Sequence, residues 1–130
     1  MADNASRVDD YFDGMCEKWA AAWERFGPPR PRFAGANVLD FGCGLGAFSV
    51  RAAQEGARVV GIDLDESSIA SAKAIAKQRF PDLDITYVHR PLGEVDGTFD
   101  LVMTNEVLEH VVDLGACLED VRKRLRPGGT

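Results

Sequence analysis

The fold of this chain is decided by the stretch Asn37-Val38-Leu39-Asp40-Phe41-Gly42-Cys43-Gly44-Leu45-Gly46-Ala47-Phe48. Its first five residues form the short, mostly apolar run of a buried strand, and the three alternating glycines that follow predict a tight turn into a helix. Glycine adopts positive φ and lets a ligand approach the backbone closely. Because a strand, a glycine turn and a helix place free amides at a helix N-terminus, the stretch predicts a nucleotide-type site in a βαβ unit.

The carboxylate of Asp40 helps to decide which ligand suits this turn. Gly42, Gly44 and Ala47, with Asp63 twenty-one residues after the first glycine, satisfy the tolerant dinucleotide fingerprint. A dinucleotide, however, would set an anionic pyrophosphate against Asp40, which also offsets part of the helix dipole. A ligand with a cationic end and no phosphate fits better, as S-adenosylmethionine does with its ammonium and sulfonium groups. An NAD-type dinucleotide remains the alternative.

The run from Asp40 to Gly46 has the form acid-x-Gly-x-Gly-x-Gly and resembles the first motif of the class I S-adenosylmethionine-dependent methyltransferases. The resemblance implies that the ammonium and sulfonium lie near Asp40 and that Asp63 binds the ribose hydroxyls. The cofactor-binding residues that it implies are Asp40, Gly42, Cys43, Gly44, Gly46, Asp63, Leu64, Leu92 and Asn105. Many relatives have an acid after the third strand for the adenine amino group; here Arg90 and Pro91 stand there, and backbone groups with Leu92 would hold the adenine.

Composition narrows the class of protein. The chain has 130 residues, about one domain, and an apolar share of 45% that is ordinary for a globular fold. A net charge of -6 argues against a general nucleic-acid or anionic-membrane binder, which needs a basic face. Three cysteines without C-x-x-C spacing indicate neither a disulfide framework nor a zinc site, which favours a cytoplasmic protein. No apolar run is long enough to span a membrane.

The N-terminal part predicts a helix. Ser6 and Asp9 have the spacing of a capping box, and Gly27-Pro28-Pro29 predicts the helix end. Between them an apolar stripe follows helical spacing: Tyr11, Phe12, Met15, Trp19, Ala22, Trp23 and Phe26. This helix either packs on the domain or forms a lid in which Trp19 and Trp23 line the substrate pocket. We divide the chain into residues 1–35, helix and connector, and residues 36–130, the S-adenosylmethionine-binding domain.

The remaining pattern alternates helices and strands. Helices are predicted over residues 48–55, 67–80 and 114–125, with Asp65 capping the second and Leu118, Val121 and Leu125 on one face of the third. Strands are predicted over residues 58–62, 85–89 and 98–104. The resemblance implies a Rossmann-like α/β fold of three α/β/α layers with parallel strands in the order 3-2-1-4. It also implies a fifth strand after Pro127-Gly128-Gly129, so the C-terminal half is incomplete and we expect a truncated sequence. In that case residues 99–103 form an unpaired edge that invites pairing with another chain.

A second constellation spans residues 98–111, Thr-Phe-Asp-Leu-Val-Met-Thr-Asn-Glu-Val-Leu-Glu-His-Val. It resembles the fourth motif of small-molecule methyltransferases, and with Ile62-Asp63-Leu64-Asp65 it is most similar to the ubiquinone-biosynthesis O-methyltransferases. On a predicted helix over residues 105–112, Glu106, Glu109 and His110 share one face. They could bind a divalent metal that activates a substrate hydroxyl; alternatively the imidazole of His110 orients loops or acts as the base.

Three functions are therefore expected in order. The first is methyl transfer from S-adenosylmethionine to a small-molecule acceptor at oxygen, with a small molecule rather than a nucleic acid as the expected partner. The second is an NAD-type dinucleotide-dependent oxidoreductase. The third is a non-catalytic half-fold module that forms an oligomer through the exposed edge of the fourth strand.

Overall fold

A computed structural model describes residues 3–26, 33–105 and 107–130, without the side chains of Trp23 and Phe26. The turn predicted at Gly27-Pro28-Pro29 lies outside these residues. In chain order the elements are α1 Asn4–Phe26, β1 Asn37–Phe41, α2 Ala47–Gln54, β2 Arg58–Ile62, α3 Glu66–Arg79, β3 Ile85–Val88, η1 Leu92–Glu94, β4 Leu101–Thr104, η2 Leu108–His110 and α4 Leu114–Arg124.

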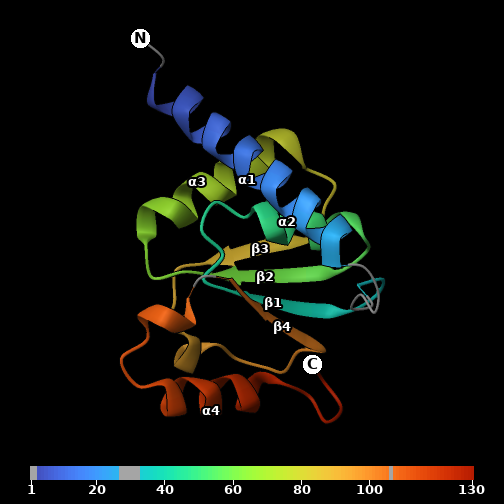
Figure 1. Ribbon diagram of the computed structural model, residues 1–130, viewed down its shortest axis with the longest axis vertical. Helices are drawn as coiled ribbons and strands as arrows, with labels where there is room; N and C mark the ends of the chain where they lie inside the picture. Colours follow the sequence, from blue (N-terminus) through green and yellow to red (C-terminus); the bar gives the residue numbers. More distant parts are fainter. Residues whose placement is uncertain (1–2, 27–32, 106) are drawn as a thin grey trace.

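The four strands form one parallel sheet in the order β3-β2-β1-β4, which confirms the predicted topology. Figure 1 shows α1, α2 and α3 on one face of the sheet and α4 on the other, so the fold has the expected three α/β/α layers. All four strands point the same way, and their carboxyl ends therefore share one edge of the sheet, where open α/β folds bind ligands.

Apolar side chains of β1 alternate between the two faces of the sheet. Val38 packs with Ala52 and Val59 beneath α2, whereas Leu39 packs with Ile62 and Phe99 on the opposite face. Both β1 side chains have no exposed surface. This two-sided burial is what makes the strand read as a continuous apolar run in the sequence.

Helix α1 is fastened to α3 by Phe12 and Arg79. The Phe12 ring is fully buried and lies 6.0 Å from the ring of Phe80. The Arg79 guanidinium lies 5.1 Å from the centre of the Phe12 ring and donates to Asp13 over 2.8 Å. The start of the helix differs from the prediction: the Asp3 carboxylate accepts from the backbone N–H of Ser6 over 2.7 Å. Asp3 is therefore the cap, and the predicted capping box of Ser6 and Asp9 is wrong.

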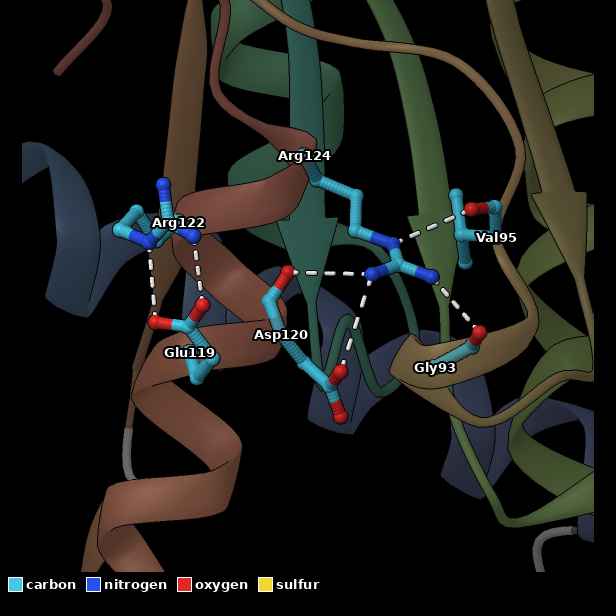
Figure 2. A network of polar contacts seen from close by, with 6 residues as sticks. All are labelled: Gly93, Val95, Glu119, Asp120, Arg122 and Arg124. Carbon is cyan, nitrogen blue, oxygen red and sulfur yellow. Dashed lines mark hydrogen bonds and ion pairs between the residues drawn. The ribbon is translucent and has the colours of Figure 1, made fainter.

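On the other face, Arg124 ties α4 to the connection between β3 and β4 (Figure 2). Its Nη2 donates to the carbonyl of Gly93 over 2.6 Å and its Nε donates to the carbonyl of Val95 over 3.1 Å. The Arg124 side chain is only 12% exposed. Figure 2 also shows the separate pair of Arg122 and Glu119, which is largely exposed. Arg124 thus supplies hydrogen-bond donors to two backbone carbonyls of this connection.

Three further predictions about the C-terminal part need correction. Residues 105–112 do not form an α-helix: in the described part of this segment, only the 3-10 turn η2 is helical. On α4, the predicted Val121 packs on the Leu39 core together with Cys117, both partly buried, whereas the predicted Leu118 is 47% exposed. β4 begins at Leu101 rather than Thr98.

The outer edge of β4 is also not fully unpaired as predicted. Phe99 N–H donates to the carbonyl of Arg124 over 2.7 Å, and Val102 N–H donates to the carbonyl of Thr130 over 2.9 Å. Thr130 N–H in turn donates to the carbonyl of Asp100 over 3.0 Å. The last residues therefore pair along the first half of this edge, in the direction that the predicted fifth strand would take.

Among the described residues, no helix is both long enough and apolar enough to cross a membrane.

Candidate functional site

A cavity of about 600 Å³ opens at the carboxyl ends of β1, β2 and β4. The glycine turn forms its floor, the loop after β2 forms one side, and α1 and the segment after β4 form the others. Its lining includes Asp40, Gly42, Cys43, Gly44, Asp63, Leu64, Asn105 and His110. Eight sequence-predicted site residues, far apart in the chain, therefore meet at one cavity.

The glycine turn is built from three residues with positive φ: Gly42 at 77°, Gly44 at 55° and Gly46 at 89°. A Cβ on Gly44 would meet no protein atom within 4 Å, so the backbone there lies open to the cavity. A Cβ on Gly46, in contrast, would overlap the hydroxyl of Tyr87. Gly46 therefore does not line the cavity; it is buried, and it lets α2 begin directly above β3.

Asp40 lies under this turn rather than at its mouth. Its carboxylate is 2% exposed and accepts from the Ser49 hydroxyl over 2.6 Å. Burial raises the pKa of Asp40 to about 6, while the hydrogen bond from Ser49 acts in the opposite direction. At neutral pH the group is therefore largely an anion in an apolar surrounding, and the cavity reaches it.

Asp63 connects the glycine turn with the end of β2. One carboxylate oxygen accepts from the backbone N–H of Gly44 over 2.9 Å, and the other accepts from that of Asp65 over 2.9 Å. Leu64 between them is 72% exposed. The imidazole of His89, for which the sequence suggested no role, donates from Nε2 to the Leu64 carbonyl over 3.0 Å. Asp63 and His89 thus hold the loop that follows β2 at the cavity.

The opposite wall of the cavity is apolar and aromatic. Trp19 on α1 meets Phe48 on α2 edge to face with ring centres 5.3 Å apart. Tyr11 and Met15 extend this wall along α1. Trp19 lines the cavity and also packs against the core of Phe12 and Val50, so its position is compatible with both interpretations of the N-terminal helix, a packing element or a lid. The side chain of Trp23 lies outside the described residues.

The segment after β4 closes the remaining side. Val107 packs so tightly against the glycine turn that a Cβ on Gly42 would overlap its methyl group. His110 lines the cavity, but its side chain is 78% exposed, and its Nε2 lies 3.7 Å from Oε1 of Glu109. Glu106 lies outside the described residues. Within the described ranges no group of three potential metal ligands forms. The sharing of one face by Glu106, Glu109 and His110 was predicted from an α-helix, whereas Glu109 and His110 lie in the 3-10 turn η2.

Two other predicted cofactor-binding residues, Cys43 and Leu92, differ in whether they line the cavity. The thiol of Cys43 lines the cavity, but burial together with Asp40 raises its pKa far above the usual range, so it stays protonated. Leu92 is 6% exposed and packs in the core with Leu39 and Phe99. Leu92 is absent from the cavity lining, in which Arg90 represents the segment after β3.

Comparison with known proteins identifies the family. The family model described as "Methyltransferase domain" matches residues 32–130. A ubiquinone biosynthesis O-methyltransferase of Caulobacter vibrioides is 40% identical over 117 residues, 87% of this chain and 46% of that protein. The corresponding enzyme of Ruegeria pomeroyi is 42% identical over 121 residues, 90% of this chain and 48% of that protein.

A solved structure agrees with these sequence relatives. The crystal structure of an S-adenosylmethionine-dependent methyltransferase from Mesorhizobium loti has a TM-score of 0.70 and 34% identity, covering 91% of this chain and 52% of that one. The chain spans about half the length of these relatives. With the parallel sheet, the glycine turn and the acids at its edge, these matches show that the chain belongs to the methyltransferase domain family.

Proposed function

We propose that this chain is the cofactor-binding part of an S-adenosylmethionine-dependent methyltransferase that modifies a small-molecule acceptor at oxygen. The observation that carries the proposal is the buried Asp40 carboxylate beneath an open glycine turn. A bound cation stabilises this buried anion, whereas a phosphate on the same turn would repel it. The Caulobacter and Ruegeria relatives support oxygen as the atom methylated.

The cavity residues fit the parts of S-adenosylmethionine. Asp40 accounts for the positive end, and the open face of Gly44 allows the ligand to lie against the backbone. Asp63 stands at the end of β2, where its carboxylate can exchange a backbone partner for ribose hydroxyls. A volume of about 600 Å³ is within the range of small-molecule sites.

Catalysis in this site requires mainly orientation. When bound, S-adenosylmethionine supplies a methyl group that its sulfonium has already activated. The apolar wall of Trp19 and Phe48 excludes water and gives an acceptor ring a surface to lie against. Holding two reactants in line lowers a barrier by ~7–11 kcal/mol. A phenolic acceptor must also lose its proton, and His110, at the cavity rim, is the base that we propose.

The proposal also covers a metal, an oligomer and a location. A divalent metal held by Glu106, Glu109 and His110 stays a prediction, since further ligands would have to come from elsewhere. An oligomer formed through β4 would use the edge beyond Val102, because Thr130 already pairs with Asp100 and Val102. A cytoplasmic location agrees with Cys16, Cys43 and Cys117, all free thiols.

Replacing Asp40 by Asn tests the proposal against the dinucleotide alternative. Calorimetry at pH 8 should show micromolar binding of S-adenosylmethionine to the unchanged protein and at least tenfold weaker binding to the variant, while any NAD binding stays equal or improves. Asp82, an exposed residue after α3, provides the matched Asp→Asn control. Tighter S-adenosylmethionine binding by Asp40→Asn would contradict the proposal.

A further inference from the structure

Three buried polar side chains gather beneath the glycine turn. Asp40 on β1, Ser49 on α2 and Tyr87 on β3 are 2%, 0% and 5% exposed. We call them the sub-turn cluster. Gly61, the partner of Asp40 on β2, makes room for them, because a Cβ there would lie 2.6 Å from the Tyr87 ring. Buried polar groups at such density are costly unless they bond to one another.

Ser49 is the member that bonds directly to the carboxylate. Its hydroxyl donates to Oδ2 of Asp40 over 2.6 Å, a short bond typical of a charged acceptor. The backbone of Ser49 also lowers the pKa of Asp40. Ser49 is the third residue of α2, where helix N–H groups have no partner within the helix, and the N-terminal cap Gly46 offers no side chain. The carboxylate thus joins the first turn of α2 to β1.

None of the other described groups named around Asp40 stabilises its charge. Asp63 at the end of β2 raises the pKa of Asp40 by repulsion, in the same direction as burial. Cys43 and Tyr87 are held neutral by burial, since their pKa values lie well above the usual ranges. On β4 the register partner is the apolar Met103. Among the described side chains that face Asp40, the donor that favours its anion is therefore Ser49.

We propose that Ser49 is a positioning residue of the cofactor site, which orients the Asp40 carboxylate and preserves it as the anion that receives the positive end of the methyl donor. This inference rests on the proposed function. Ser49 lies below Asp40 and is absent from the cavity lining, so it acts through the carboxylate and not by contact with the ligand.

The test follows the Asp40 carboxyl group directly by ¹³C NMR in the ligand-free protein as pH is varied. The unchanged protein should titrate near pH 6. Ser49→Ala should raise this midpoint by about one pH unit or more, because the bond to a charged acceptor is lost. Ser49→Cys, nearly isosteric but a weaker donor, should give a smaller rise and serves if the alanine variant fails to fold. Ser68→Ala removes a hydroxyl that donates to Asp65 and not to Asp40, and should leave the midpoint unchanged.

The second readout is the affinity for S-adenosylmethionine at two pH values. With the midpoint raised by about one unit, Ser49→Ala should bind about fivefold more weakly than the unchanged protein at pH 6 and nearly equally at pH 8.5. A merely structural defect would weaken binding by the same factor at both. An unchanged midpoint in folded Ser49→Ala and Ser49→Cys, or equal weakening at both pH values, overturns the inference. If the unchanged protein fails to bind S-adenosylmethionine at pH 8.5, the proposed function falls, while the NMR midpoint still reports whether Ser49 holds Asp40.

Discussion

Replacing Asp40 by Asn should make the protein more stable at neutral pH. The buried carboxylate has a pKa of about 6 in the folded chain, compared with 3.8 for an ordinary Asp. A group whose pKa is raised on folding binds its proton more tightly in the folded state, so stability falls as pH rises from 3.8 through about 6. The shift corresponds to a cost of about 3 kcal/mol at pH 7.5. Asn keeps the size of the side chain and an oxygen that can accept from Ser49, but carries no charge.

The gain should depend on pH in a defined way. At pH 7.5 Asp40→Asn should raise the free energy of unfolding by about 3 kcal/mol, or the midpoint of thermal unfolding by about 10 °C. At pH 5, where the carboxyl group is mostly protonated in the folded state, the gain should shrink to about 1.5 kcal/mol.

Urea unfolding followed by circular dichroism at the two pH values measures both gains, with Asp82→Asn as the control that should change neither. A loss of stability, or the same gain at both pH values, would refute the reasoning that Asp40 is a destabilising buried anion. A site that binds a cation can retain such an anion at the expense of stability, as functional sites often do.

Three other changes test how the elements around the site are held. Arg124→Ala should lower the free energy of unfolding by about 2 kcal/mol in urea titrations, because the Gly93 and Val95 carbonyls lose a buried charged donor, whereas Arg122→Ala should cost no more than about 0.5 kcal/mol. Gly46→Ala should abolish ligand binding and lower the thermal midpoint, since Tyr87 occupies the space and φ is 89°; an alanine variant of normal stability would contradict the geometry. Arg79→Ala should loosen α1, at a cost of about 1 kcal/mol, and hasten proteolysis within this helix; unchanged cleavage would show that the apolar contacts of α1 hold it without Arg79.

Much of the fold could be predicted because its signals are local. Glycine at positive φ marks the turn after β1, and Asp65 caps α3 through the backbone N–H of Ser67. The apolar run of residues 58–62 became β2 without a shift at either end. Such features depend on neighbours in the chain, which the sequence displays directly.

The segment after β4 was predicted poorly because a tertiary contact and a local helix cap compete with helix formation. Val107 is packed against Gly42, and Asp113 caps α4 by accepting from the N–H of Ala116. Between them Val111 is extended, with φ −81° and ψ 130°. A continuous α-helix over residues 105–112 would need helical backbone angles at Val111. Because Val111 is extended instead, the described part of this segment forms a single 3-10 turn.

The sequence predicted the site residues that lie at the ends of strands. It did not predict the residues that hold those side chains and loops in place. Asp40 and Asp63 stand at strand ends, where parallel sheets place ligands. Ser49 and His89 have no motif of their own, because their roles arise from contact with Asp40 and with the Leu64 carbonyl. Signals of this kind appear only when distant parts of the chain meet.

The most direct measurement of the central claim is a paired calorimetric titration of the unchanged protein, at one pH near 8, with S-adenosylmethionine and with NAD. Because the Asp40 anion lies beneath the glycine turn, we expect saturable, micromolar binding of S-adenosylmethionine. We expect no detectable binding of NAD, because the anion would repel its pyrophosphate. Preferential binding of NAD would contradict the account.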